Sequence, residues 1–150
     1  MDTMFIPTHP TYSQLHDDCT ALCRLMEPAD LIIGLSRGGL LPGVICSHLL
    51  NIPFKPLEYS SKRGQGDGIN SNHIPPWISE NYVPTHVHLL DDIVDSGHTI
   101  AEVVRILTEN NFSVNVVSIY YKESAIFTPH LYKYKIPHDF GWIVFPFERI

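Results

Sequence analysis

The sequence predicts an α/β fold with a mainly parallel, twisted sheet flanked by helices. Short apolar runs alternate along the chain with segments of helical periodicity, in the order strand, helix, strand, and this alternation is typical of parallel sheets. Turns that contain Gly and Ser directly follow two of the apolar runs, at the position where open α/β sheets bind their ligands. Both observations favour a ligand-binding α/β domain.

Length and composition agree with a single domain over residues 1–150. The chain has 150 residues, 44% of them hydrophobic, which is enough for a genuine core. A net charge of −6 and the lack of a basic run argue against a nucleic-acid partner. The sequence shows no basic, apolar leader and no apolar stretch near the roughly 18 residues of a membrane span, so we expect no membrane partner and a cytoplasmic location.

The first predicted element is a helix over residues 12–26, with Thr11 or Ser13 as its cap. Its apolar residues recur at the spacing of one buried helix face: Leu15, Cys19, Leu22, Cys23 and Met26. The cysteines are odd in number, since Cys46 is the third, and two of them lie four positions apart on this helix. We therefore expect buried, reduced thiols rather than disulfides.

The middle of the chain contains further predicted elements and one long polar segment. The pattern predicts a first strand-helix-strand unit with a strand over 30–35, a turn over 36–39, a helix over 40–50 and a strand over 52–57. It predicts a second such unit with a strand over 86–90, a helix over 99–110 and a strand over 113–121. Residues 58–84 are rich in Gly, Ser and Asn and contain Pro75 and Pro76. Because loops above roughly 12 to 15 residues are uncommon unless they cover a site, we predict a flexible lid here.

The most informative segment runs from Val87 to Thr99, where an apolar strand leads into acidic residues and then into a small-residue turn that opens a helix. The unpaired N–H groups and the positive dipole end of a helix start favour an anion such as a phosphate. Gly97 permits close approach, and Ser96 and Thr99 add hydroxyl donors. The turn therefore predicts a phosphate-binding site.

Three carboxylates stand in the same segment: Asp91, Asp92 and Asp95. Carboxylates would repel a neighbouring phosphate, so we expect them to bind sugar hydroxyls, a divalent cation or a proton instead. An acidic pair at a strand end can also be no more than a solvated turn.

The turn over residues 36–39, Ser-Arg-Gly-Gly, is a second candidate site. Its backbone N–H groups and the Arg37 guanidinium could hold a diphosphate. Taken alone, such a turn is more often an ordinary surface turn. Its place at the end of a predicted strand, like that of the acidic segment, favours the functional interpretation.

The acidic segment, Leu-Asp-Asp-Ile-Val-Asp-Ser-Gly-His-Thr over residues 90–99, resembles the phosphoribosyl diphosphate (PRPP) motif of the type I phosphoribosyltransferases. The turn over 36–39 is similar to their pyrophosphate loop, in which a non-proline cis peptide would fall between Ser36 and Arg37. The resemblance implies the type I phosphoribosyltransferase fold, with the lid over about 58–84 and a small C-terminal hood over about 123–150.

The end of the chain resembles the xanthine-guanine and hypoxanthine-guanine members of that family. Lys122 ends a predicted strand, and residues 136–147 read Ile-Pro-His-Asp-Phe-Gly-Trp-Ile-Val-Phe-Pro-Phe. The resemblance implies that Lys122 donates to the 6-oxo oxygen of a purine, that Trp142 stacks on the base and that Ile143 contributes backbone groups. Taken singly, the lysine could be a solvated strand end and the tryptophan a core aromatic.

The resemblance implies the remaining roles. Ser96, Gly97, His98 and Thr99 would hold the 5-phosphate; Asp91 and Asp92 would orient the ribose hydroxyls directly or through Mg²⁺, the implied cofactor; and Ser36, Arg37 and Gly38 would hold the pyrophosphate. Asp95 would be the catalytic residue that accepts the N7 proton as the base attacks. The His98 side chain could equally point to water. The lid reads Tyr59-Ser60-Ser61 where many relatives carry Ser-Tyr, so no lid residue is assigned to the diphosphate.

These roles predict a purine salvage enzyme that transfers phosphoribose from PRPP to N9 of guanine, xanthine or hypoxanthine. Two alternatives stay open, namely transfer to another nucleobase and a non-catalytic PRPP-sensing module, because the fold does not establish the activity. The resemblance also implies a homodimer or homotetramer. The apolar tail over 144–147 could form a partner surface or cover the base.

Overall fold

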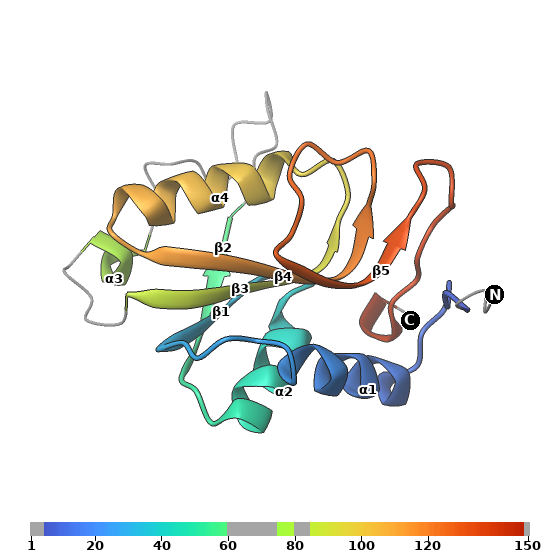
Figure 1. Ribbon diagram of the computed structural model, residues 1–150, viewed down its shortest axis with the longest axis horizontal. Helices are drawn as coiled ribbons and strands as arrows, with labels where there is room; N and C mark the ends of the chain where they lie inside the picture. The colour runs from blue at the N-terminus through green and yellow to red at the C-terminus, as the bar shows by residue number, and fades with distance from the viewer. Residues whose placement is uncertain (1–4, 60–74, 80–84, 149–150) are drawn as a thin grey trace.

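The computed structural model describes residues 5–59, 75–79 and 85–148. Its described part contains a five-stranded sheet in the order β2-β1-β3-β4-β5, and every neighbouring pair is parallel (Figure 1). The strands are β1 (Leu31–Ser36), β2 (Phe54–Glu58), β3 (His86–Val94), β4 (Ser113–Lys122) and β5 (Leu131–Ile136). The predicted α/β class with a mainly parallel sheet is thereby confirmed.

Helices cover both faces of the sheet (Figure 1). The helices are α1 (Tyr12–Cys23), α2 (Leu40–Leu50), α3 (Pro76–Ser79) and α4 (His98–Glu109), with a short 3-10 turn, η2, at Pro146–Glu148. One apolar cluster joins the sheet to α4 and α3, and a second joins the opposite face to α1, α2 and the C-terminal segment. The sheet is thus the middle layer of three.

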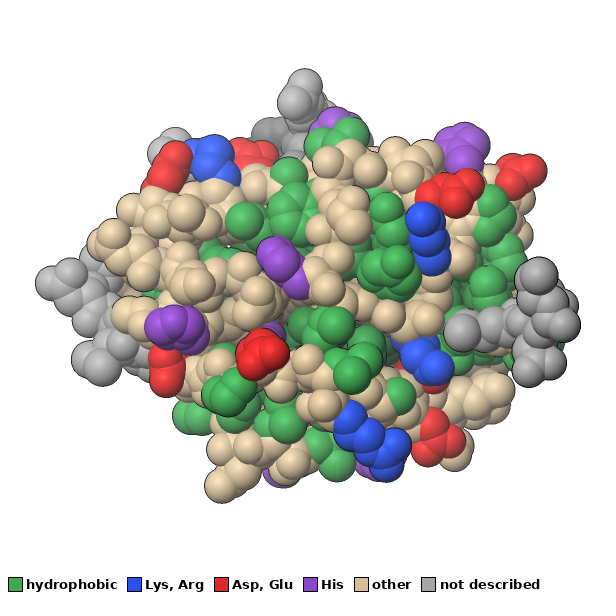
Figure 2. Space-filling view, in the orientation of Figure 1, with side chains coloured by type: hydrophobic (Ala, Val, Ile, Leu, Met, Phe, Trp, Pro, Cys, Tyr) green, Lys and Arg blue, Asp and Glu red, His purple; other side chains and the backbone are tan. Residues whose placement is uncertain are grey.

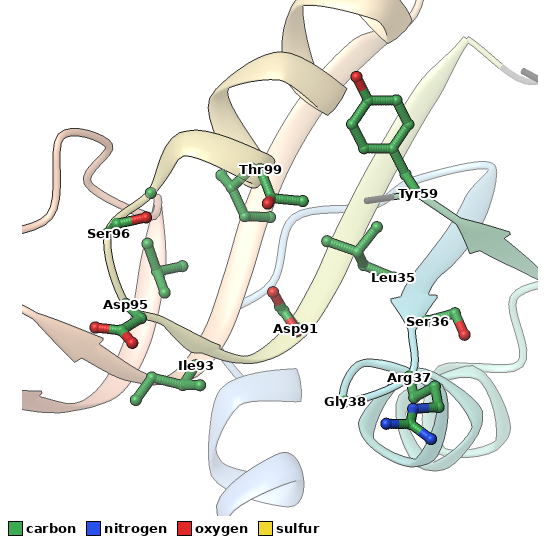
Figure 3. A pocket seen from close by; sticks show the side chains of 13 residues that line it. Leu35, Ser36, Arg37, Gly38, Tyr59, Asp91, Ile93, Asp95, Ser96 and Thr99 are labelled. Atoms are coloured by element: carbon green, nitrogen blue, oxygen red, sulfur yellow. The ribbon is translucent and has the colours of Figure 1, made fainter. Parts of the chain in front are cut away.

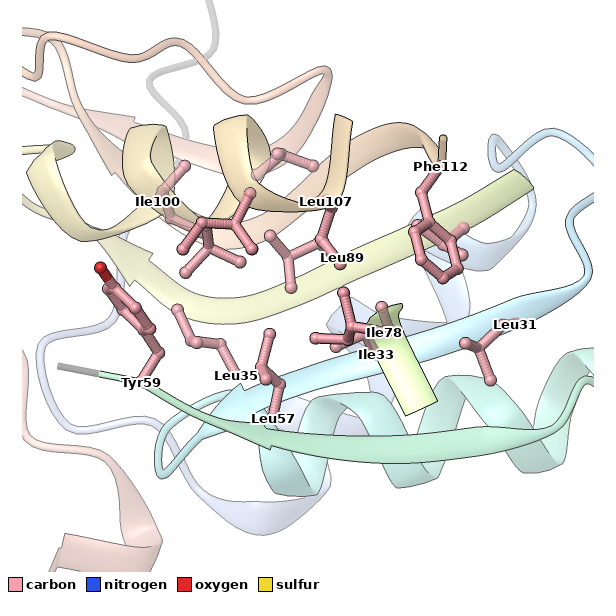
Figure 4. Packing of buried hydrophobic residues seen from close by; sticks show 14 of the residues in the cluster. Leu31, Ile33, Leu35, Leu57, Tyr59, Ile78, Leu89, Ile100, Leu107 and Phe112 are labelled. Atoms are coloured by element: carbon pink, nitrogen blue, oxygen red, sulfur yellow. The ribbon is translucent and has the colours of Figure 1, made fainter. Parts of the chain in front are cut away.

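The packing of β1 on both faces of the sheet explains its continuous apolar run. Leu31, Ile33 and Leu35 pack in the cluster on the α4 side, while Ile32 packs in the cluster on the α1 and α2 side. Figure 4 shows Ile33 and Leu35 on the side of α4 and Leu89, and Leu31 further along the strand toward Phe112. Because successive strand residues face opposite sides and both sides are covered, every position must be apolar.

Helix α1 begins where the sequence predicts and ends earlier. Thr11 is its N-cap in a capping box with Gln14, whose backbone N–H donates to the Thr11 hydroxyl at 3.1 Å while its side chain accepts from the Thr11 N–H at 2.8 Å. The helix ends at Cys23 instead of Met26. Met26 packs against the same core from the following turn, so the apolar spacing continues beyond the helix.

Strand β5 was not predicted. Its residues, Leu-Tyr-Lys-Tyr-Lys-Ile, alternate apolar and charged side chains at the edge of the sheet. The segment that connects it to β4, residues 123–130, contains no helix, so the sequence lacks the usual strand-helix-strand signal of a parallel pair. Within the predicted hood over 123–150, residues 131–136 form this edge strand of the sheet.

The rest of the predicted hood packs on the sheet. Phe145 is 2% exposed and its ring lies 5.5 Å from the Tyr120 ring of β4, edge to face. The tail over 144–147 is therefore no exposed apolar surface, which favours its alternative interpretation as part of a cover. Residues 149–150 lie outside the described part of the chain.

Most of the predicted lid lies outside the described residues, so its length and motion stay predictions. Glu58 completes β2, and α3 forms within the segment. The three cysteines are buried and free, as expected. Among the described helices, none has the length and apolar character needed to cross a membrane. On the visible face, Lys and Arg side chains lie scattered rather than gathered into one patch (Figure 2).

Candidate active site

The carboxyl ends of β1, β3 and β4 meet at one edge of the sheet because the three strands are parallel neighbours. A cavity of about 360 Å³ lies there, between the loop after β1 and the loop after β3 (Figure 3). Of the predicted site residues, it is lined by Ser36, Arg37 and Gly38 from the first loop, by Asp95, Ser96, Gly97 and Thr99 from the second, and by Asp91 between them. Residues predicted from two separate motifs thus share one cavity.

The loop over residues 36–39 connects β1 to α2. The peptide bond between Ser36 and Arg37 is cis, as the resemblance implies. A Cβ atom on Gly38 would collide with the carboxyl group of Asp92, so only glycine lets the loop lie against β3 at this point. Arg37 is exposed and lines the cavity, where its guanidinium is available to an anion.

The loop over residues 95–97 connects β3 to α4. Gly97 is the N-cap of α4 in the left-handed conformation, with φ of 89°, and the His98 N–H donates to the Ser96 hydroxyl at 3.4 Å. The start of α4 therefore faces the cavity with the N–H groups and dipole end that suit an anion. His98 is exposed and does not line the cavity, a position that agrees with the alternative in which its side chain points to water.

Asp91 and Asp92 lie within β3, which extends beyond the predicted apolar run to Val94. Burial raises the pKa of Asp91 well above its ordinary value, and the neighbouring Asp92 carboxylate raises it further. Burial also raises the pKa of Asp92. Two neighbouring half-buried carboxylates are costly unless hydroxyl groups or a cation compensate them.

The chemistry of this pair fits Mg²⁺, which prefers oxygen ligands. Each carboxylate already accepts one backbone N–H: Asp91 Oδ1 that of Asp92 at 2.9 Å, and Asp92 Oδ1 that of Ile93 at 2.7 Å. The described residues contain no group of three or more His, Cys, Asp or Glu side chains that could hold a metal. An ion held by Asp91 or Asp92 would therefore draw its other ligands from substrate and water.

A second cavity, of about 110 Å³, lies beside the first and collects the predicted base-binding residues. It is lined by Asp92, Ile93, Asp95, Lys122, Gly141, Trp142, Ile143, Phe145 and Glu148. Lys122 Nζ forms an ion pair with Asp95 Oδ1 at 2.8 Å, in which the lysine side chain is 21% and the aspartate side chain 62% exposed. Trp142 is 76% exposed, so its indole face is free to stack on a ligand.

The structure adds site residues that the sequence did not indicate. Tyr59 lines the first cavity, and burial raises the pKa of its hydroxyl. Glu148 lines the second cavity and also a third, of about 760 Å³, that extends to Arg37. Tyr59 lies at the start of the predicted lid, to which no ligand role was assigned, and Glu148 follows the last aromatic residue of the chain, outside the motifs. Their roles depend on packing between distant segments.

Residues 13–149 match the family model described as the phosphoribosyl transferase domain. The chain belongs to this family. A match over nearly the whole chain agrees with the site geometry, since the two loops that line the first cavity belong to the two segments that carry the resemblance.

Relatives of this phosphoribosyltransferase include two curated proteins named xanthine-guanine phosphoribosyltransferase. The protein from Chromohalobacter salexigens is 28% identical over 148 residues, which cover 92% of this chain and 82% of the relative. The protein from Desulfotalea psychrophila is 26% identical over an alignment of 161 residues, gaps included. This alignment covers 99% of this chain and 91% of the relative.

Among solved structures, the purine phosphoribosyltransferase from Pyrococcus horikoshii is similar to this chain with a TM-score of 0.77 and 26% sequence identity. The similarity covers 95% of this chain and 93% of that one. The predicted type I phosphoribosyltransferase fold is thereby confirmed. In this phosphoribosyltransferase, we call residues 95–97 the 5-phosphate loop and residues 36–39 the pyrophosphate loop, after the roles that the sequence resemblance implies for them.

Proposed function

We propose that the protein transfers the 5-phosphoribosyl group of PRPP to N9 of a 6-oxopurine, which is guanine, xanthine or hypoxanthine, and releases pyrophosphate. The observation that carries this proposal is that the two cavities meet at Asp95. This residue lines both the cavity between the two anion-binding loops and the cavity that contains Lys122 and Trp142. A phosphoribosyl donor and a flat base would therefore react beside the same carboxylate.

The first cavity suits PRPP. The 5-phosphate loop would hold the 5-phosphate through the N–H groups at the start of α4, with hydroxyl donors from Ser96 and Thr99. The pyrophosphate loop would hold the diphosphate with Arg37. Asp91 lies between the two loops in the same cavity, where it would bind the ribose hydroxyls.

The second cavity suits a 6-oxopurine. The lysine ammonium donates hydrogen bonds and cannot accept them, so Lys122 would favour a 6-oxo group over a 6-amino group. Trp142 offers an exposed stacking surface, and Ile143 is 5% exposed in the wall beside it. The two curated relatives are named for xanthine and guanine, and these names support a base of this class.

The proposed chemistry needs a proton acceptor at the base and charge compensation at the leaving group. Asp95 would accept the N7 proton of the purine as N9 attacks the anomeric carbon. The pyrophosphate loop would stabilise the negative charge that develops on the departing diphosphate. When bound near Asp91 or Asp92, Mg²⁺ would supply further positive charge to the diphosphate.

A homodimer or homotetramer and a cytoplasmic location stay predictions for this protein. Light scattering of the purified chain would test the first, since a monomer at micromolar concentration would contradict it. The non-catalytic sensing module is not favoured, because the described site combines the first cavity, which we call the donor cavity, with the second, which we call the base cavity.

Product formation tests the proposed function. The purified protein, PRPP and Mg²⁺ are incubated separately with guanine, xanthine, hypoxanthine, adenine and uracil, and each nucleotide is identified by chromatography. We expect nucleotides from the 6-oxopurines alone and no product when Mg²⁺ is chelated. Conversion of adenine or uracil in preference to the 6-oxopurines would overturn the base assignment. PRPP binding without conversion of any base would instead favour the non-catalytic sensing function.

A further inference from the structure

The segment between β4 and β5, residues 123–130, lies directly against the 5-phosphate loop (Figure 1). We call this segment the crossover. The backbone N–H of Ile126 donates a hydrogen bond of 2.8 Å to the backbone carbonyl of Ser96. The crossover thus contacts the loop through its main chain, and this contact is independent of the side chain at position 126, which is 63% exposed.

The contact determines which way one peptide unit of the loop points. The described chain has its one cis peptide bond between Ser36 and Arg37, so the bond between Ser96 and Gly97 is trans. In a trans peptide the C=O and N–H groups point in opposite directions. Because Ser96 directs its carbonyl to the crossover, Gly97 directs its N–H away from the crossover, and both residues line the cavity.

The approach of the two segments leaves little room for a different arrangement. A Cβ atom on Gly97 would lie 2.8 Å from the Phe127 backbone nitrogen, which is closer than side chains normally approach a backbone. Phe127 and Ala125 pack against the apolar cluster below α4, so the crossover is anchored on both sides of Ile126. The donor for the Ser96 carbonyl is therefore held in a defined place.

We propose that the Ile126 backbone amide is a positioning group for the 5-phosphate of PRPP. By holding the Ser96 carbonyl away from the cavity, it aims the Gly97 N–H at the phosphate. Without this donor the peptide unit could rotate and bring a carbonyl oxygen, which repels an anion, into the cavity. The inference rests on the proposed function, since it assigns the ligand of the 5-phosphate loop to the donor substrate.

A single-atom backbone change tests the inference. Replacing the Ile126 N–H with an ester oxygen, through an α-hydroxy acid with the isoleucine side chain, removes the donor and keeps the side chain. The same change at His130 is the matched control, because the His130 N–H donates to the Val116 carbonyl at the same distance of 2.8 Å and lies at the far end of the same crossover. Calorimetry measures the affinities for PRPP, ribose 5-phosphate and pyrophosphate, and thermal unfolding reports on the fold.

We expect the ester at 126 to lower the affinities for PRPP and ribose 5-phosphate by about tenfold to a hundredfold. This is the range for one hydrogen bond to a charged group. Pyrophosphate affinity and turnover at saturating PRPP should stay within about threefold of the parent, as should all affinities of the ester at 130. Equal effects of the two esters, or a loss of pyrophosphate affinity as large as that of ribose 5-phosphate, would overturn the inference. A parent protein that binds no PRPP would instead overturn the proposed function.

Discussion

At the scale of single residues, Asp95 connects the two halves of the site. It lines the donor cavity and the base cavity, and it forms an ion pair with Lys122, the residue that would bind the 6-oxo oxygen. The carbonyl oxygen of a base in this cavity would compete with Asp95 for the lysine. Base binding would thereby free the carboxylate to accept the N7 proton.

Replacing this carboxylate should separate catalysis from donor binding. We expect Asp95→Ala to lower turnover by roughly 10² to 10⁴, the usual contribution of a general base, with PRPP affinity within a few fold of the parent. Steady-state kinetics and calorimetry with PRPP measure the two effects. Asp139→Ala is the control, because Asp139 is an exposed aspartate of the same region that lines none of the three cavities. Parental turnover in Asp95→Ala would remove this residue from the mechanism.

At the scale of elements, the pyrophosphate loop depends on β3 for its place. Gly38 lies so close to Asp92 that the loop and the acidic strand cannot be altered independently. The N-terminal end of α4 depends in the same way on the crossover, through Ser96 and Ile126. Both loops of the first cavity are thus supported by neighbours that belong to other strand-loop units.

A methyl group at position 38 should disturb the diphosphate end of the site and spare the 5-phosphate end. In Gly38→Ala the added carbon collides with the Asp92 carboxylate, so either the loop or the acid must move. We expect pyrophosphate affinity to fall at least about tenfold, because misplaced donors lose a hydrogen bond to a charged group. Ribose 5-phosphate affinity, measured by the same calorimetry, should change less than about threefold. Unchanged pyrophosphate affinity would show that the contact with Asp92 does not position the loop.

The element that the sequence failed to predict, β5, shows where local patterns lose information. Parallel strands are normally recognised by the helix between them, and here an extended crossover replaces that helix. By contrast, β1, α2 and β4 lie within one residue of their predicted bounds, because their apolar residues are contiguous or helically spaced. Thr11, the observed N-cap of α1, is one of the two cap residues that the sequence predicts.

At the scale of the whole molecule, a buried acid joins the outer helix to the edge of the sheet. Asp18 of α1 is 5% exposed, and its Oδ1 accepts a hydrogen bond of 2.9 Å from the Tyr134 hydroxyl of β5. Its Oδ2 is buried and has no partner among the described residues. Burial raises the pKa of Asp18 above its ordinary value, although the Tyr134 hydrogen bond opposes the shift.

This raised pKa predicts how stability depends on pH. Folding raises the pKa of this carboxyl group above its unfolded value of 3.8. The group therefore contributes its full stability to the fold below pH 3.8, and this contribution is lost as the pH rises through the folded pKa. Asp18→Asn keeps the acceptor for Tyr134 and removes the charge. We therefore expect the variant to unfold at higher urea than the parent at pH 7, with the difference shrinking toward pH 4. A variant that is equally destabilised at both pH values would contradict this account, and Asp17→Asn, at an exposed neighbouring position, is the control.

The sequence by itself determined the α/β class, the two loops that end apolar strands and the family resemblance, because these depend on contiguous residues whose spacing reflects local geometry. The tertiary structure alone decided which groups face one another: the Lys122 ion pair with Asp95, the place of Glu148 at the base cavity and the Ile126 amide behind the 5-phosphate loop. These contacts join segments far apart in the chain. They depend on strand order, on the register of the parallel pairs and on the path of a crossover without a helix, none of which a local pattern encodes.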